Sequence, residues 1–180
     1  MLINQSKAQL LLIDMQERLL PAMAAAERVL KHAIILAKAA RTLDLPISIS
    51  EQYPKGLGHT VAPLKDEIGN APVDEKIEFS CWKNAALRDR ITQNKREQVI
   101  VAGIETHVCA LQTAMDLKEA GYQVFVVADA MSSRVEPSAE LAFARMQQAG
   151  IAIVTTEMVV FEALGAAGTP EFKQLSALIR

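Results

Sequence analysis

Cysteine is scarce in this chain of 180 residues, which contains only Cys81 and Cys109. Two cysteines cannot build a disulfide framework or a four-thiolate metal site. Basic residues are not in excess either, because 19 Lys and Arg stand against 21 Asp and Glu, and the longest basic run is the pair Lys95-Arg96. This balance offers no electrostatic basis for holding a phosphate backbone, so no nucleic-acid partner is expected.

Long apolar runs are also missing. The best candidate for a membrane span is interrupted by Asp14 and Gln16, and no run reaches the roughly 18 to 20 residues that a span needs. The first residues lack an apolar core of signal-peptide length after a basic start. A hydrophobic content of 51% excludes disorder. We therefore expect one globular domain over residues 1–180, located in the cytoplasm and without a membrane partner.

Short apolar runs alternate with longer helical patterns along the chain. Strands are predicted at residues 9–15, 46–50, 98–104, 124–128 and 151–155, with a weaker extended stretch at 73–79. Helices are predicted at 23–43, 82–93, 107–120, 138–149, 157–164 and 170–179, and a loop at 51–63. Strands separated by helices of this length favour βαβ units. The fold class expected is α/β, a three-layer, Rossmann-like and mostly parallel sheet with helices on both faces.

Ligands of an open parallel sheet collect beyond the carboxyl ends of its strands, so reactive side chains were sought there. Asp14 ends the first strand among apolar neighbours, where a carboxylate needs a partner; its alternative role is capping or loop ordering. Cys109 falls in the first turn of the helix after strand 98–104, where the helix dipole favours a thiolate. A buried structural cysteine fits that position equally well. Cys81 is expected to serve packing.

Several other polar residues carry weaker signals. Lys76 lies within two positions of three acidic residues, so taken alone it predicts a surface ion pair. His59 and His107 are site candidates, whereas His32 is expected to face solvent or to pack within a long helix. The sequence contains no Gly-x-Ser-x-Gly, no His-Glu-x-x-His, no Gly-x-Gly-x-x-Gly and no P-loop, which excludes serine hydrolases, zinc proteases and two classes of nucleotide-binding protein.

Three segments, taken together, resemble the isochorismatase-like cysteine hydrolase superfamily over roughly residues 8–161. They read Leu12-Ile13-Asp14-Met15-Gln16, then Lys76-Ile77-Glu78-Phe79-Ser80-Cys81-Trp82, then Gly103-Ile104-Glu105-Thr106-His107-Val108-Cys109. Residues 50–58, Ser-Glu-Gln-Tyr-Pro-Lys-Gly-Leu-Gly, are similar to a narrower branch, the isochorismatase-domain proteins. Each motif alone is modest, but three in the correct order and strand context are specific.

The resemblance implies a catalytic triad of Asp14, Lys76 and Cys109. It also implies a cis peptide between Ile104 and Glu105, with the backbone amides of Glu105 and Cys109 forming an oxyanion hole. The activity it suggests is metal-independent hydrolysis of a small amide or related carbonyl compound through a thioester, with no cofactor. Two alternatives stay open: isochorismatase-type hydrolysis of a vinyl ether with Asp14 as general acid, and a non-catalytic interaction protein on the same fold.

Other expectations concern the surroundings of this triad. A substrate pocket is expected from residues in the site loops, namely Gln16, Tyr53, Phe79, Trp82 and His107. The family's metal-binding Asp-x-His is replaced by Gln-Tyr-Pro at residues 52–54, so no metal is expected. Glu105 stands where Thr is usual, and its charge is expected to repel an anionic substrate. The apolar composition and Ala-rich helical faces further predict a homo-oligomer.

Overall fold

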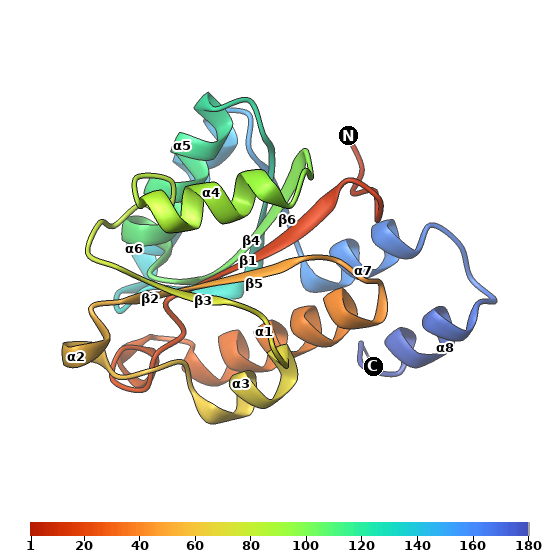
Figure 1. Ribbon diagram of the computed structural model, residues 1–180, viewed down its shortest axis with the longest axis horizontal. Coiled ribbons are helices and arrows are strands. Elements are labelled where there is room, and N and C mark those ends of the chain that lie inside the picture. The colour runs from red at the N-terminus through yellow and green to blue at the C-terminus, as the bar shows by residue number, and fades with distance from the viewer. Residues whose placement is uncertain (180) are drawn as a thin grey trace.

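The computed structural model describes residues 1–179 and contains one six-stranded parallel sheet (Figure 1). Its strand order is β3-β2-β1-β4-β5-β6, and the strands are β1 (Ala8–Ile13), β2 (Ile47–Gln52), β3 (Val73–Lys76), β4 (Gln98–Ile104), β5 (Gln123–Ser132) and β6 (Ala152–Val154). Every pairing between neighbouring strands is parallel. This confirms the α/β class expected from alternating strands and helices.

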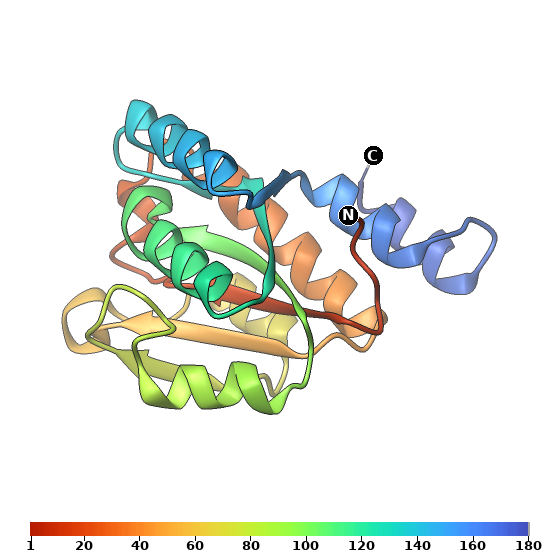
Figure 2. The same ribbon diagram turned by 90° about the horizontal axis from the view of Figure 1, so that it is seen from above.

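Helices cover both faces of the sheet, as Figures 1 and 2 show. One face carries α1 (Ala26–Thr42), α3 (Ala62–Ile68), α7 (Thr156–Leu164) and α8 (Pro170–Ser176). The other carries α4 (Ala85–Gln93), α5 (Leu111–Glu119) and α6 (Glu136–Gln148). Among residues 1–179, no helix has the length and apolar character needed to cross a membrane.

The central strand β1 supplies apolar side chains to both layers. Leu10 and Leu12 pack in the cluster beneath α1, whereas Leu11 and Ile13 pack in the cluster beneath α4 and α5. This alternation follows from the two-residue period of a strand, and the continuous apolar run is what a sheet covered on both faces requires. Between these layers, β1 places its last residues at the middle of the sheet's carboxyl edge.

Some predicted boundaries were wrong. The segment predicted as a loop over 51–63 contains α2 (Pro54–Leu57) and the start of α3. The helix predicted from residue 107 begins instead as a π-helical turn, η2 (Thr106–Ala110), which continues into α5. A 3-10 turn, η1 (Leu20–Ala22), precedes α1, and the helix predicted from residue 23 begins instead at Ala26.

Gly103 lets β1 and β4 approach closely beside the carboxyl edge. Its φ is 118°, and a Cβ built there would lie 2.1 Å from the carbonyl oxygen of Ile13. An L side chain therefore fits neither the backbone conformation nor the space. Because the strands are parallel, the segments that follow β1, β2, β3 and β4 all emerge at this edge, and there the candidate residues meet.

Candidate functional site

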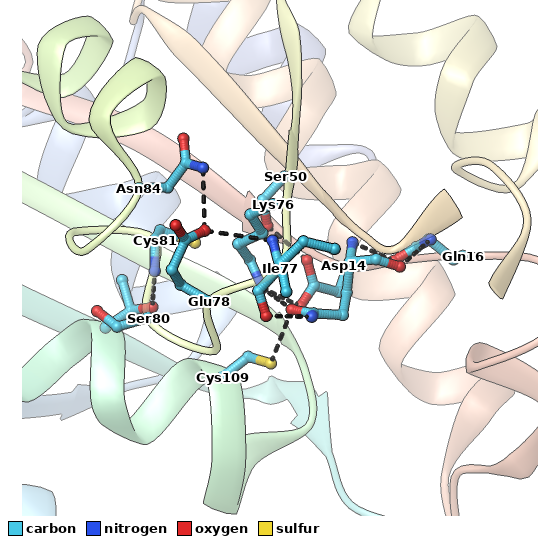
Figure 3. Close-up of polar contacts among 12 residues, drawn as sticks. Asp14, Gln16, Ser50, Lys76, Ile77, Glu78, Ser80, Cys81, Asn84 and Cys109 are labelled. Atoms are coloured by element: carbon cyan, nitrogen blue, oxygen red, sulfur yellow. Dashed lines mark hydrogen bonds and ion pairs between the residues drawn. The ribbon is translucent and has the colours of Figure 1, made fainter. Parts of the chain in front are cut away.

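Asp14 and Lys76 form a buried ion pair at the carboxyl edge of the sheet (Figure 3). Asp14 follows β1 with φ 52°, in the left-handed region that Asp tolerates better than most residues. The Lys76 ammonium donates to Asp14 Oδ2 at 2.7 Å, and the hydroxyl of Ser50 donates to Oδ1 at 2.6 Å. Neither side chain of the pair is exposed. The expectation of a surface ion pair for Lys76 is therefore wrong.

The charges of this pair influence one another strongly. Burial raises the pKa of Asp14, although Lys76 and the Ser50 hydroxyl oppose that rise. For Lys76, burial acts to lower the pKa, but the charge of the Asp14 carboxylate and its hydrogen bond oppose this, and the pKa is raised. Lys76 is consequently an ammonium group, and Asp14 is a carboxylate of increased basicity.

Gln52, the last residue of β2, is a third partner in this cluster. Its Oε1 accepts a hydrogen bond from the Lys76 ammonium at 2.6 Å, and its Nε2 donates to the carbonyl oxygen of Ile77 at 2.7 Å. Sequence reasoning treated Gln52 only as the residue in place of a metal ligand. In the structure β2 pairs with β3 so that Gln52 lies opposite Lys76, a neighbour relation that the sequence pattern alone does not give.

Cys109 lies opposite this cluster, on the π-helical turn that follows β4. It is 6% exposed, and its Sγ is 4.0 Å from Gln52 Oε1. Burial and the charge of Asp14 raise the pKa of the Cys109 thiol, and Lys76 only partly opposes them. From its position, the sequence left open whether Cys109 is a thiolate stabilised by a helix start or a buried structural cysteine. In the structure the thiol form is favoured, because burial and the Asp14 carboxylate outweigh Lys76.

Cys81 differs from Cys109 in its surroundings. It is fully buried, and its backbone N–H donates to the hydroxyl of Thr113 at 2.9 Å. Burial raises the pKa of the Cys81 thiol to about 11. Cys81 belongs to the apolar cluster beneath α4 and α5, which is the packing position expected from the sequence.

The turn that carries Cys109 is tied to the segment after β5. The peptide bond between Ile104 and Glu105 is cis, as the resemblance implied. The Glu105 carboxylate accepts hydrogen bonds from the backbone N–H and the Nε of Arg134, at 3.0 and 3.1 Å. His107 Nδ1 lies 2.8 Å from the hydroxyl oxygen of Ser133. Since Arg134 balances its charge, Glu105 does not present the uncompensated anion expected to repel anionic substrates.

Within residues 1–179, no group of three or more His, Cys, Asp or Glu side chains is arranged to hold a metal ion. The polar centre therefore consists of a carboxylate, an ammonium, an amide and a thiol. Such a set can transfer a proton between sulfur and oxygen and can present sulfur to an electrophilic carbon.

Comparison with known proteins identifies the family of this chain. The model of the isochorismatase domain matches residues 8–158, which is most of the chain. This protein belongs to the isochorismatase family. Isochorismatase domain-containing protein 2A of Mus musculus is 38% identical over 173 residues, covering 95% of this chain and 82% of the mouse protein.

Solved structures of the same fold are also similar. A protein described as MAR1 ribonuclease from Caenorhabditis elegans has a TM-score of 0.94 at 39% identity, covering 99% of this chain and 92% of that one. The YcaC gene product of Escherichia coli, described as an octameric hydrolase of unknown specificity, has a TM-score of 0.93 at 26% identity, covering 98% and 90%. This agreement extends the isochorismatase fold over almost the whole of this chain.

The residues expected to line a pocket in this isochorismatase-family site have different surroundings. Gln16 is fully buried, and its amide bonds the backbone of Gln52 on both sides and the carbonyl oxygen of Gly58. Its polar atoms are thus engaged in holding the loop after β2. Tyr53 and Phe79 are each about half exposed, at 52% and 54%.

Trp82 packs edge-on against Tyr122, with ring centroids 5.5 Å apart. A surface pocket of about 390 Å³ borders Lys76, and Tyr53, Ile77 and Asn84 are among the residues that line it. Of the predicted pocket residues, Tyr53 is therefore the one that the structure places on a hollow beside the buried pair.

One polar atom of the turn is left without a partner. Thr106 is fully buried, and its hydroxyl has no hydrogen-bond partner in the part of the chain that the structure describes. His59, the other histidine that the sequence singled out, lies outside the cluster. Its Nδ1 is 2.9 Å from Glu51 Oε2, a contact that fastens the loop after β2.

Proposed function

We propose that this protein is a metal-independent cysteine hydrolase that acts on a small amide or related carbonyl compound. The observation that carries the proposal is the convergence of Asp14, Lys76 and Cys109 on one buried cluster from three separate segments. A buried ion pair beside a thiol contributes little to the stability of a fold, because the cost of desolvating the two charges offsets their attraction. This argues against a purely structural interaction protein.

In the first half of the reaction, the Asp14 carboxylate takes the proton of the Cys109 thiol as sulfur attacks the carbonyl carbon. A carbon–sulfur bond forms, and the carbonyl π electrons move to oxygen. The backbone N–H groups of Glu105 and Cys109 would receive that oxyanion, and each such donor is typically worth about 2.7 to 4 kcal/mol in the transition state. The carbon–nitrogen bond then breaks, and the amine leaves with the proton from Asp14. A thioester on Cys109 remains.

In the second half, water attacks the thioester while Asp14 accepts its proton. The carbon–sulfur bond breaks, the carboxylic acid is released, and the proton returns to Cys109. Lys76 stays protonated throughout and keeps the Asp14 side chain in place. The raised pKa of Asp14, caused by burial, suits both steps, because it makes the carboxylate a stronger base toward the thiol and toward water.

Isochorismatase-type hydrolysis of a vinyl ether is the second candidate, and one observation favours it. A carboxyl whose pKa burial raises is a better general acid, and the same Asp14 would protonate the ether. In that reaction Cys109 has no covalent role. The ribonuclease description of the C. elegans relative has less support here, since the chain is slightly acidic overall.

Turnover of a panel of small primary amides, measured with and without EDTA, tests the proposal. Wild type and Cys81→Ala should release ammonia from at least one amide, with EDTA making no difference, whereas Cys109→Ala should be inactive. A Cys109→Ala protein that hydrolyses a vinyl ether as fast as wild type would favour the ether reaction. Absence of turnover with amides, esters and vinyl ethers alike would favour the non-catalytic alternative.

We also propose that the chain assembles into a homo-oligomer in the cytoplasm. The similar E. coli protein is octameric, and Leu2, Leu141 and Ile77 are about 70% exposed here. A reducing compartment suits a mechanism that needs a free thiol. Light scattering at micromolar concentration should give a multiple of 19.6 kDa; a monomer would refute the assembly.

A further inference from the structure

Gln52 holds its amide in a fixed place at the carboxyl edge of the sheet. Its backbone N–H donates to Gln16 Oε1 at 2.7 Å, and its backbone carbonyl accepts from Gln16 Nε2 at 3.0 Å. Gln16 is itself fully buried. The main chain of Gln52 is therefore bonded on both sides, and only its side chain remains to be oriented.

The partners of the side chain determine which way the amide faces. The carbonyl oxygen of Ile77 can only accept, so the group 2.7 Å from it must be the NH₂ of Gln52. The ammonium of Lys76 can only donate, so the group 2.6 Å from it must be the amide oxygen. The same oxygen is the one 4.0 Å from Cys109 Sγ. A flipped amide would lose both strong hydrogen bonds.

We propose that Gln52 is a positioning residue for the reaction, an inference that rests on the proposed function. Its amide oxygen and the Asp14 carboxylate hold the Lys76 ammonium between them, at 2.6 and 2.7 Å. This arrangement directs the ammonium toward the carboxylate that receives the thiol proton. It also places an uncharged acceptor, rather than a second anion, next to the sulfur.

The neutrality of the amide matters because the net charge of the cluster is close to zero. Asp14 and Lys76 cancel, and burial and Asp14 already raise the pKa of the Cys109 thiol. A second carboxylate at this place would leave a net negative charge beside the sulfur and raise that pKa further. An apolar side chain would instead remove the oxygen dipole and leave the ammonium less compensated.

Gln52→Glu and Gln52→Met test this by the alkylation rate of Cys109 with iodoacetamide at pH 8. The expected order is Met fastest, wild type intermediate and Glu slowest, with Glu at least tenfold below wild type, which one pKa unit on the thiol would produce. Both variants should hydrolyse p-nitrophenyl acetate at least tenfold more slowly than wild type. Gln52→Met loses the hydrogen bond that holds Lys76, whereas the carboxylate of Gln52→Glu competes with Asp14 for the ammonium and raises the pKa of the thiol. Alkylation and hydrolysis thus change in opposite directions in Gln52→Met.

The pH dependence of Gln52→Glu gives a second readout. A protonated carboxyl has the hydrogen-bonding pattern of the amide, because its hydroxyl donates to Ile77 and its carbonyl accepts from Lys76. Two carboxyls that share one ammonium release their second proton at a raised pKa. The alkylation rate of Cys109 in Gln52→Glu, divided by the rate in wild type, should therefore be close to one at the lowest pH measured and fall as pH rises.

Gln9→Glu is the matched control. Gln9 is also a buried amide on a strand of the same sheet, where it bonds the carbonyl oxygens of Ile91 and Arg96. It lies five residues before Asp14 along the chain, about 16 Å away at the rise of a strand. Its replacement disturbs a comparable network without touching the thiol, so its alkylation rate should equal that of wild type at every pH.

Each outcome decides the matter. A pH-independent ratio in Gln52→Glu, or an equal change in Gln9→Glu, would overturn the role of Gln52. If Gln52→Glu does not fold, the opposite changes in Gln52→Met decide alone, and parallel loss of alkylation and hydrolysis would overturn the inference. Complete alkylation of Cys109 in wild type distinguishes failure of the proposed function from failure of this inference. If the alkylated protein still hydrolyses the ester, the proposed function is refuted. If it does not, but the Gln52 variants hydrolyse the ester as fast as wild type, only the role of Gln52 is refuted.

Discussion

Replacement of Lys76 by Met should destabilise the fold, because it leaves the buried Asp14 carboxylate without its partner. Asp14 and Lys76 have no exposed side-chain surface, and their charged atoms are 2.7 Å apart. Removing one partner of such a pair typically lowers the free energy of unfolding by about 3 to 5 kcal/mol, because an uncompensated charge stays in the interior. For a chain of this size, about 4 kcal/mol corresponds to a melting temperature lowered by about 10 °C.

The loss in the free energy of unfolding should grow as pH rises. Burial already raises the pKa of Asp14 above its ordinary value, and without the ammonium that rise becomes larger. The contribution of a carboxyl with a raised folded-state pKa is fully present below the unfolded pKa and is lost as pH rises through the folded pKa. At about 1.4 kcal/mol per pH unit, a loss of 3 to 5 kcal/mol extends over about 2 to 4 pH units above the unfolded value.

Urea unfolding followed by the fluorescence of Trp82, the single tryptophan, measures this between pH 4.5 and 8. Lys38→Met is the matched control, because Lys38 pairs with Glu67 at 3.2 Å on the surface and such pairs are worth about 0 to 1 kcal/mol. A loss below about 1 kcal/mol at pH 7 in Lys76→Met, or one that does not change with pH, would refute the account of the pair.

Three further predictions concern single features. Cys109 should be alkylated before Cys81, because it is 6% exposed whereas Cys81 is fully buried. The rate at Cys109 should rise about tenfold per pH unit up to pH 9 without a plateau, since its pKa is raised; preferential labelling of Cys81 in peptide maps would contradict this. The pKa of Glu51 is lowered: burial acts to raise it, but hydrogen bonds from Thr60 and His59 outweigh burial. Glu51→Gln should therefore lower the free energy of unfolding by about 1 to 3 kcal/mol at pH 7, and by less as pH falls below the ordinary pKa of Glu. Urea titrations in which this loss grows at acid pH would contradict the prediction. Gly103→Ala should cost about 3 to 5 kcal/mol by overpacking and strain. Gly121→Ala shares the positive φ, at 94°, but a Cβ there meets nothing, so it should cost only the strain, about 1 to 2 kcal/mol; equal melting temperatures would count against the close approach.

Much of the fold was readable from local pattern. The strand predicted over 98–104 coincides with β4, because a buried parallel strand is a continuous apolar run with sharp polar flanks. The short helix α2 was missed because Pro54 and two nearby glycines signal a turn. In the structure Pro54 occupies the first helical position, which proline tolerates well. The π-helical turn at Cys109 had no sequence signature, because it differs from an α-helical turn only in the spacing of its backbone hydrogen bonds.

The candidate site was partly readable. Asp14 and Cys109 could be found because reactive residues that follow strands of a parallel sheet meet at one edge. Lys76 could not be assigned from its neighbours, since the acidic residues around it in sequence are not the ones that it contacts in space. Its partners are Asp14, which follows β1, and Gln52, which ends β2. Only the pairing of β2 with β3, or the family resemblance, brings them together.

Intact-protein mass spectrometry during hydrolysis of p-nitrophenyl acetate tests the central claim, that Cys109 forms a thioester, most directly. The account predicts a transient mass increase of one acetyl group, mapped to Cys109, in wild type and in Cys81→Ala. Cys109→Ala should show none. Hydrolysis by wild type with no acetylated Cys109 at any time, or the same acetyl adduct in Cys109→Ala, would contradict the account.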